Sequence, residues 1–254
     1  MPGLLDGQTA VIAGIANKWS IAYGIAESFA REGASLVLTY LNDKQRETIE
    51  SIVGHLPVIK MIACDVSKDE EVAALTEQLR ELGRPINALV HSLAFANRED
   101  LGRPFVETDR EGFLLAHSIS AYSLVAMARA VAPLMTEGGS IMTLSYLGSI
   151  RVRPNYNVMG VAKAALEASV RYLANDLGPS KIRVNTISAG AVKTASARAV
   201  KDLSVMLEAT KEHSPLRHVT EAGEVGDAAV FLASRLSRGM TGNMLFVDSG
   251  MHLM

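Results

Sequence analysis

Short apolar runs alternate with longer stretches of helical character along the whole chain. Clear stop signals end two of the helical stretches: Gly33 follows residues 20–32, and Gly178 with Pro179 follows residues 156–177. Several of the apolar runs are continuously hydrophobic, which is typical of β-strands that are covered on both faces. The predicted strands span residues 9–13, 35–40, 58–64, 86–91, 140–144, 183–188 and 244–247.

This alternation predicts the fold class. Strands separated by helices form right-handed βαβ units, which place successive strands in a mostly parallel sheet. We therefore predict an α/β fold of the Rossmann type, a doubly wound, mostly parallel seven-stranded sheet with helices on both faces. No linker, composition break or repeat divides the chain, so residues 1–254 are expected to form a single domain. Ligands bind at the carboxyl ends of such strands, so functional residues should follow them.

Composition and charge exclude several classes of protein. The hydrophobic fraction of 48% and the charged fraction of 20% are those of a compact globular protein. A formal net charge of −2 provides no electrostatic footprint for nucleic acid and no polybasic handle for a membrane. The single cysteine, Cys64, cannot form an internal disulfide, and no apolar run reaches the roughly 18 residues of a spanning helix. The first residues lack the pattern of a signal peptide. We expect a cytoplasmic protein without nucleic-acid or membrane partners.

The turn after the first predicted strand is a candidate phosphate site. It retains Gly14 and Gly24 from a glycine pattern, but it is longer than the usual dinucleotide-binding turn. Ser20 is well placed to cap the following helix, whose N-terminus would face a pyrophosphate. By itself this pattern fits a tight strand–helix turn equally well.

The ends of the next three strands bear on the cofactor. No acid for the ribose ends the second strand, and no basic residue directly follows Tyr40, where a 2′-phosphate would need one, which favours NADH over NADPH. Asp65 follows the third strand and is expected to accept a hydrogen bond from adenine, with Val66 packed on the ring, or to cap the next turn. His91 lies in an apolar strand and is expected to be packed rather than catalytic.

The candidate catalytic pair is Tyr156 and Lys163, which are seven positions apart on a predicted helix. At ~100° per residue this spacing brings both side chains to one face, about two turns apart. A phenol there can donate a hydrogen bond to a developing enolate, and a nearby ammonium is expected to lower the pKa of the phenol. The spacing alone fits an ordinary helix face as well. Tyr40 and Lys44 have the spacing of common short-chain reductases, but they follow the second strand and are discarded.

Over essentially its whole length, the chain resembles the divergent branch of the short-chain dehydrogenase/reductases that contains bacterial enoyl-acyl-carrier-protein reductase. In this branch the tyrosine precedes the lysine by seven positions, whereas in the ketone reductases it lies one turn nearer. Ser249 departs from the pattern, because relatives often have glycine there. The distinctive stretches are residues 20–26, 91–96, 144–148, 154–160, 183–185 and 188–190, which read SIAYGIA, HSLAFA, LSYLG, PNYNVMG, RVN and SAG.

The resemblance implies an NADH-dependent reductase of enoyl thioesters, with Tyr156 stabilising the enolate, Lys163 holding the nicotinamide ribose and Tyr146 positioning the thioester. It implies a cofactor site for NAD lined by residues near the ends of the strands and by Lys163 on the predicted helix: Gly14, Ala16, Ser20, Ile21, Asp65, Val66, Ser92, Leu93, Ala94, Leu144, Lys163, Ala189, Gly190, Val192 and Thr194. It implies a substrate site formed by Phe95, Ala96, Tyr146, Tyr156, Met159, Ala197 and Met206.

The resemblance also implies a substrate-binding loop with helices at about residues 191–213, an acyl carrier protein as partner and a homotetramer. Two alternatives remain open at this stage. One is a carbonyl reductase of the same superfamily that acts on β-ketoacyl substrates. The other is a dinucleotide sensor without turnover, although the presence of both Tyr156 and Lys163 argues against it.

Overall fold

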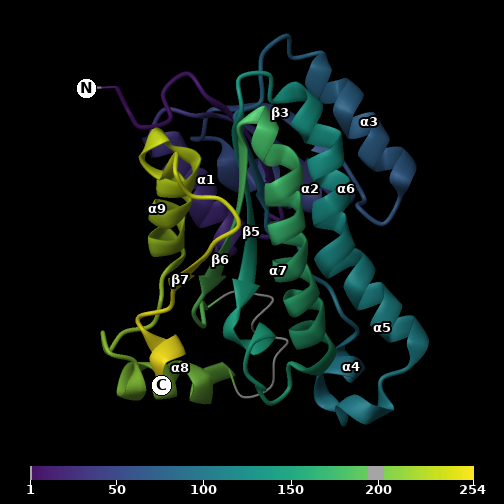
Figure 1. The fold of residues 1–254 in the computed structure, drawn as a ribbon, viewed down its shortest axis with the longest axis vertical. Helices are drawn as coiled ribbons and strands as arrows, with labels where there is room; N and C mark the ends of the chain where they lie inside the picture. The colour runs from purple at the N-terminus through teal and green to yellow at the C-terminus, as the bar shows by residue number, and fades with distance from the viewer. Residues whose placement is uncertain (1, 194–202) are drawn as a thin grey trace.

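A parallel β-sheet forms the centre of the protein (Figure 1). The computed structural model describes residues 2–193 and 203–254, and in this part of the chain the sheet has seven strands in the order β3-β2-β1-β4-β5-β6-β7. Every pair of neighbouring strands is parallel, which confirms the predicted Rossmann-type fold. The strands are β1 (Thr9–Ala13), β2 (Ser35–Tyr40), β3 (Val58–Ala63), β4 (Ala88–His91), β5 (Gly139–Tyr146), β6 (Ile182–Ala189) and β7 (Met244–Val247).

Helices cover both faces of the sheet. On one face α1, α2 and α9 pack with the sheet in one hydrophobic cluster, and on the other face α3, α6 and α7 form a second cluster. Figure 1 shows α1 and α9 on one side of the strands and α6 and α7 on the other. These helices are α1 (Ile21–Arg31), α2 (Asp43–Val53), α3 (Asp69–Arg80), α6 (Ser123–Val131), α7 (Asn157–Leu177) and α9 (Ala222–Ala233).

The predicted strands differ from the observed ones mainly in length. Three of them match at both ends, whereas the strand predicted at residues 140–144 extends over Gly139–Tyr146. The extension matters, because it places Ser145 and Tyr146 in the sheet. This strand points toward the lower part of Figure 1, where the helices α4 (Arg98–Gly102) and α8 (Leu203–His213) lie.

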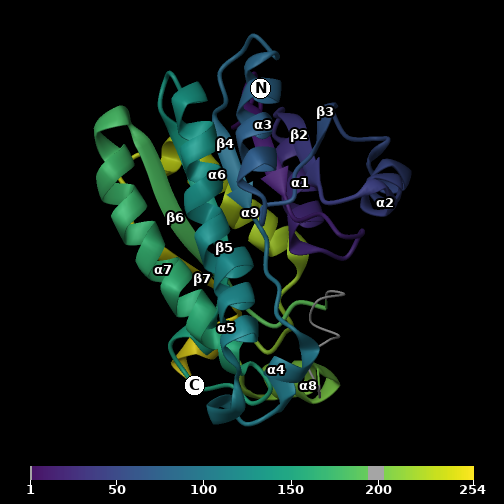
Figure 2. The same cartoon turned by 90° about the vertical axis from the view of Figure 1, so that its right-hand side faces the viewer.

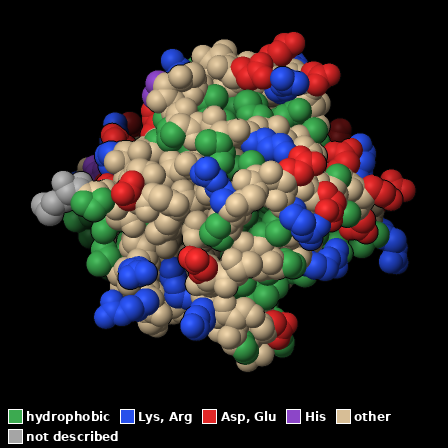
Figure 3. All heavy atoms as spheres, turned by 90° about the horizontal axis from the view of Figure 1, so that it is seen from above, with side chains coloured by type: hydrophobic (Ala, Val, Ile, Leu, Met, Phe, Trp, Pro, Cys, Tyr) green, Lys and Arg blue, Asp and Glu red, His purple; other side chains and the backbone are tan. Residues whose placement is uncertain are grey.

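The opposite edge of the molecule is seen in Figure 3. Lysine and arginine side chains are interspersed there with acidic and hydrophobic ones, as on an ordinary solvated surface. The acidic groups gather mainly toward the right-hand side of this view.

A continuous helical stretch runs from Arg110 to Leu134 and joins α5 (Arg110–His117) to α6, as Figure 2 shows. By length and composition it could cross a membrane, with a mean hydropathy of 1.3, but 56% of its apolar window is buried inside the protein. The sequence criterion of an unbroken apolar run misses this stretch, because polar residues such as Arg129 interrupt it. Its contacts with α3 and α7 are those of a core helix.

Candidate active site

Two tyrosine rings meet at the carboxyl edge of the sheet. Tyr146 ends β5, and Tyr156 is the N-cap residue of α7. Their ring centroids are 5.0 Å apart, and the ring planes are inclined by 69°. Gly148 leaves room for the rings, because a Cβ atom at this position would lie 2.4 Å from Cδ1 of Tyr156. The structure therefore brings together two of the three predicted catalytic side chains.

Lys163 lies two turns further along α7 and is 5% exposed. Its Nζ donates a hydrogen bond of 2.7 Å to the carbonyl oxygen of Leu144 on β5. Burial lowers the pKa of Lys163 to about 8, and the charge of Glu167 opposes this effect. An ammonium has three donors, so two of them remain for a ligand.

The expected effect of the lysine on the phenol is wrong. The pKa of Tyr156 is raised above its ordinary value of 10.0, first by burial and then by the charges of Tyr146 and Glu167. Loss of hydration disfavours the charged phenolate, so the pKa rises. Tyr156 is therefore a protonated hydrogen-bond donor at neutral pH.

His91 is a packed residue, as predicted. It is fully buried, and its ring nitrogens lie 2.9 Å from Oγ1 of Thr143 and 2.8 Å from Oγ of Ser123. Burial, together with the positive charge of Lys163, lowers the pKa of His91 to about 3. The imidazole is neutral, and both nitrogens are engaged by protein.

The turns after β1 and β4 approach each other closely. Gly14 has a φ of 109°, and a Cβ atom there would lie 2.0 Å from the carbonyl oxygen of Ser92. Only glycine fits such a conformation next to another backbone. Leu93, the next residue after Ser92, packs against the hydrophobic cluster under α6. The backbones of these two turns lie side by side at the carboxyl ends of β1 and β4, where the strand order of the sheet reverses. Dinucleotides bind at this point in such folds.

Two predicted contacts of this region have a different local role. Ser20 is the N-cap residue of α1, but its hydroxyl makes no capping bond and donates instead to the carbonyl oxygen of Asn17 at 2.6 Å. Asp65 caps the turn after β3, where its Oδ1 accepts from the nitrogen and the hydroxyl of Ser67 at 3.0 and 2.7 Å. The second of the two roles considered for Asp65 is thus present.

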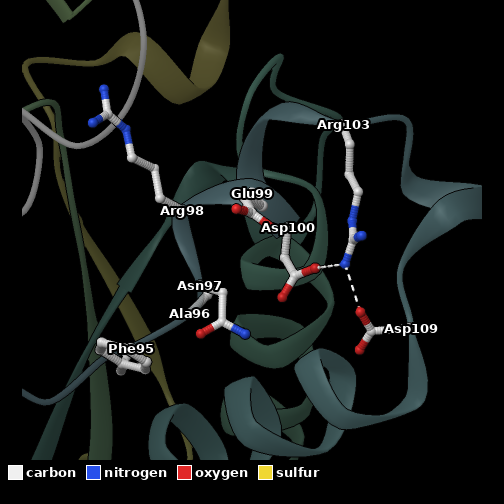
Figure 4. Close-up of a pocket in the computed structure, with 8 residues that line it drawn as sticks. All are labelled: Phe95, Ala96, Asn97, Arg98, Glu99, Asp100, Arg103 and Asp109. Carbon is white, nitrogen blue, oxygen red and sulfur yellow. Dashed lines mark hydrogen bonds and ion pairs between the residues drawn. The ribbon is translucent and has the colours of Figure 1, made fainter.

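A pocket of about 590 Å³ lies between the segment after β4 and α4, and neither tyrosine is among its lining residues. Asn157, which follows Tyr156, ties the start of α7 to this pocket through hydrogen bonds from Nδ2 to the carbonyl oxygens of Leu101 and Arg103 at 3.1 and 2.6 Å. Figure 4 shows Arg103 between two carboxylates of the pocket wall. The lining comprises the predicted substrate residues Phe95 and Ala96 together with Asn97, Arg98, Glu99, Asp100, Arg103 and Asp109.

Ser120 is a contributor that the sequence did not reveal. It lies in a π-helical segment, Ser118–Tyr122, between α5 and α6 and is fully buried. Its hydroxyl accepts from the nitrogen of Phe95 at 2.9 Å and donates to the carbonyl oxygen of Phe95 at 3.0 Å. Single turns of π-helix are frequent at functional sites. That type of helix would have been the only local signal, and it has no simple sequence pattern.

The remaining predicted residues surround the same edge. Val192 is 7% exposed and belongs to the core under α1 and α9, while Met159 is buried on α7. Gly190 lies against Thr220, whose Oγ1 would be 2.5 Å from an added Cβ atom. Outside the described residues lie Thr194, Ala197 and the side chain of Met206. Ala16, Ile21, Val66, Ala94, Leu144 and Ala189 lie on or directly after the strands and at the start of α1.

Comparison with known proteins identifies the family. A family model described as Enoyl-(Acyl carrier protein) reductase matches residues 14–252. The chain belongs to this family. Among its relatives is the Bacillus cereus enoyl-[acyl-carrier-protein] reductase [NADH] FabI, which is 51% identical over 99% of both chains. The Staphylococcus aureus (strain MRSA252) enoyl-[acyl-carrier-protein] reductase [NADPH] FabI is 48% identical over 98% of both chains.

Solved structures of enoyl-acyl-carrier-protein reductases superpose on the whole chain. The Bacillus cereus enzyme with NADP⁺ and indole naphthyridinone has a TM-score of 0.95 at 51% identity, with 99% of both chains covered. The Aquifex aeolicus enoyl-[acyl-carrier-protein] reductase (NADH) has a TM-score of 0.96 at 45% identity, again with 99% of both chains covered. The resemblance stated from the motifs is thereby confirmed.

Proposed function

We propose that this chain reduces the trans-2 double bond of an enoyl thioester, carried by acyl carrier protein, with NADH in fatty-acid synthesis. The observation that carries this proposal is the ring contact between Tyr146 and Tyr156 at the end of β5, the strand on which Leu144 binds the buried Lys163. Residues 1–254 would act as a single NAD-binding reductase domain, with a substrate-binding segment at about residues 191–213.

The residues present fit a dinucleotide. Gly14 packs its backbone against that of Ser92 and has no side chain. A ribose and a pyrophosphate can therefore lie along this turn without obstruction by a side chain of Gly14. The N-terminus of α1 has no acidic residue in its first turn, so its amide groups face an anion without competition. Lys163 would hold the nicotinamide ribose with the donors that Leu144 does not use. The other predicted cofactor residues are proposed for the same site.

The proposed mechanism assigns one task to each side chain. When bound, the reduced nicotinamide supplies the hydride for the β-carbon of the enoyl group. Negative charge then develops on the thioester oxygen, and the hydroxyl of Tyr156 donates a hydrogen bond to it. The raised pKa of Tyr156 keeps this donor protonated. Tyr146 holds the thioester against Tyr156, and the α-carbon is protonated in a later step.

The surroundings of Tyr40 favour NADH over NADPH. Leu41 follows it and is exposed, so an apolar side chain stands where a 2′-phosphate needs a cation. Arg46 is engaged by Glu50 at 2.8 Å, as expected for a surface charge on α2. Because relatives use either cofactor, this preference is a separate part of the proposal.

The wider setting follows from the proposed reaction. The acyl chain would contact Phe95, Ala96 and Met159, with Ala197 and Met206 on the substrate-binding segment. We propose acyl carrier protein as the macromolecular partner, a homotetramer as the assembly and the cytoplasm as the location, with neither nucleic acid nor membrane as partner.

The test is the loss of NADH absorbance with a short trans-2-enoyl thioester, run beside NADPH and a β-ketoacyl thioester. Turnover of the enoyl substrate with NADH is the expected result. Turnover of the ketone alone would move the protein to the carbonyl reductases. Binding of NADH without turnover of either substrate would leave a dinucleotide sensor as the function.

A further inference from the structure

Glu167 is a buried carboxylate next to the proposed catalytic groups. It lies on α7, four residues after Lys163, and is 8% exposed. Residues four apart on a helix face the same side. A carboxylate in such a place costs free energy unless a hydrogen bond or an opposite charge compensates it. The structure provides both kinds of compensation.

The hydrogen bond comes from the end of β5. Oγ of Ser145 donates to Oε1 of Glu167 at 2.5 Å. The residue before it, Leu144, accepts from Nζ of Lys163 with its carbonyl oxygen at 2.7 Å. Consecutive residues of one strand thus hold the ammonium and the carboxylate.

The opposite charge is Lys163 itself. Among the described residues it is the only buried lysine or arginine. Burial favours the neutral amine, whereas the negative charge of Glu167 favours the ammonium. His91 on β4 is neutral, because burial and the charge of Lys163 lower its pKa to about 3.

Other titratable groups lie on the elements packed against α7. Tyr146 at the end of β5 and Tyr156 on α7 contact each other and are protonated at neutral pH. Two ion or hydrogen-bonded pairs lie on or beside the helices packed against α7, Asp100 with Arg103 and Arg129 with Tyr122. Glu167 is therefore the charge that opposes the effect of burial on Lys163.

We propose that Glu167 is a positioning residue, whose carboxylate, held by Ser145, keeps Lys163 protonated in the working pH range. This role deepens the proposed function, because only a protonated Lys163 donates three hydrogen bonds, one to Leu144 and two to a ribose. Glu167 itself touches neither cofactor nor substrate in this assignment. A residue that only packed between α7 and the sheet would have no influence on the charge of Lys163.

The experiment measures the titration of Lys163 directly. Protein labelled with ¹³C at the lysine Cε positions is titrated by NMR without cofactor or substrate, and Lys163→Arg identifies the signal. Wild type is expected to titrate near pH 8. In Glu167→Gln, which keeps the shape and removes the charge, the midpoint is expected to fall by about one pH unit or more. An unchanged midpoint in a folded Glu167→Gln protein overturns the proposal.

Ser145→Ala is the matched variant, because it keeps the charge and removes the hydrogen bond. Its midpoint is expected to fall less than that of Glu167→Gln, and an equal or larger fall contradicts the assignment of the effect to the charge. Should Glu167→Gln not fold, Glu167→Asp serves instead, since its carboxylate is further from Lys163 and a measurable fall is expected. An unchanged midpoint in that variant counts against the proposal.

The affinity for NADH as a function of pH supplies a second readout. In Glu167→Gln it is expected to decline at lower pH than in wild type. In a Lys163→Arg background the same substitution should leave the pH profile unchanged, because arginine does not titrate in this range. The NMR titration remains valid if the protein does not reduce enoyl thioesters, so failure of the proposed function and failure of this role are distinguishable.

Discussion

The rings of Tyr146 and Tyr156 meet edge to face, with centroids 5.0 Å apart and planes inclined by 69°. One ring comes from the end of a central strand and the other from the start of the helix that follows it. An edge-to-face contact restrains the direction of both rings. The pair therefore forms a rigid wall against which a thioester can be held, and each ring depends on the other for its position.

Removal of the Tyr156 hydroxyl tests its role as the donor to the enolate. In Tyr156→Phe the ring contact remains, and turnover is expected to fall by about 10²–10³-fold, as for the loss of one oxyanion donor. The affinity for NADH should stay near that of wild type. Tyr172→Phe is the control, because this tyrosine is on the same helix and is 76% exposed. Unchanged turnover in Tyr156→Phe would remove the residue from the mechanism.

Gly148 tests the position of the rings without touching a hydroxyl. In Gly148→Ala the new methyl group would lie 2.4 Å from Cδ1 of Tyr156 and 3.2 Å from Cδ1 of Tyr146, so at least one ring must move. A displacement of about 1 Å can cost roughly 10²-fold in rate, and we expect a loss of kcat of this order. Gly178→Ala is the matched control, since an added Cβ there meets nothing within 4 Å. Wild-type kcat in Gly148→Ala would show that the ring positions are not critical.

Much of the fold could be predicted from the chain, because a parallel sheet reads as short apolar runs between helical patterns. The position of Tyr156 and Lys163 near the start of one helix could also be predicted, since it depends only on the helical pattern. The contacts of Ser120 with Phe95 and of Ser145 with Glu167 could not, because 25 and 22 positions separate these residues. Their proximity follows from packing between elements, which no local pattern encodes.

Two errors have physical causes of the same kind. The pKa of Tyr156 was expected to be lowered by the lysine, but burial dominates and raises it. Burial is a property of the folded protein, and it cannot be obtained from helix geometry. Ser20 has the position of an N-cap residue, yet its hydroxyl turns to the carbonyl oxygen of Asn17.

Ser249, which replaces a common glycine, adopts a φ of 57°, so the backbone keeps a glycine-like conformation despite the substitution.

His91 is expected to make the protein sensitive to acid. Its pKa is about 3 in the folded protein, against an ordinary value of 6.5. Between these values the unfolded chain binds one proton more than the folded protein, so stability falls as the pH is lowered from 6.5 toward 3. The slope contributed by one such group is up to about 1.4 kcal/mol per pH unit. Urea unfolding between pH 7 and 4 measures it.

The comparison for this prediction is His91→Gln, which cannot take up the proton. We expect this variant to be less stable at pH 7, because it disturbs the hydrogen bonds with Thr143 and Ser123, but to lose less stability on acidification. His55→Gln is the control for the substitution itself, since the His55 side chain is 61% exposed. Equal slopes in wild type and His91→Gln would assign the acid sensitivity to other groups.

Ser120 is expected to control substrate binding through the backbone of Phe95. In Ser120→Ala the nitrogen and the carbonyl oxygen of Phe95 lose their shared partner, and an unpaired polar group costs about 1–3 kcal/mol. Because Phe95 lines the pocket after β4 and is a proposed substrate residue, the loss should appear as a KM for the enoyl thioester that is raised about tenfold, with a smaller change in kcat. Ser51→Ala, on the exposed face of α2, is the control. A fall in kcat at constant KM would instead place the effect of Ser120 on the reacting groups.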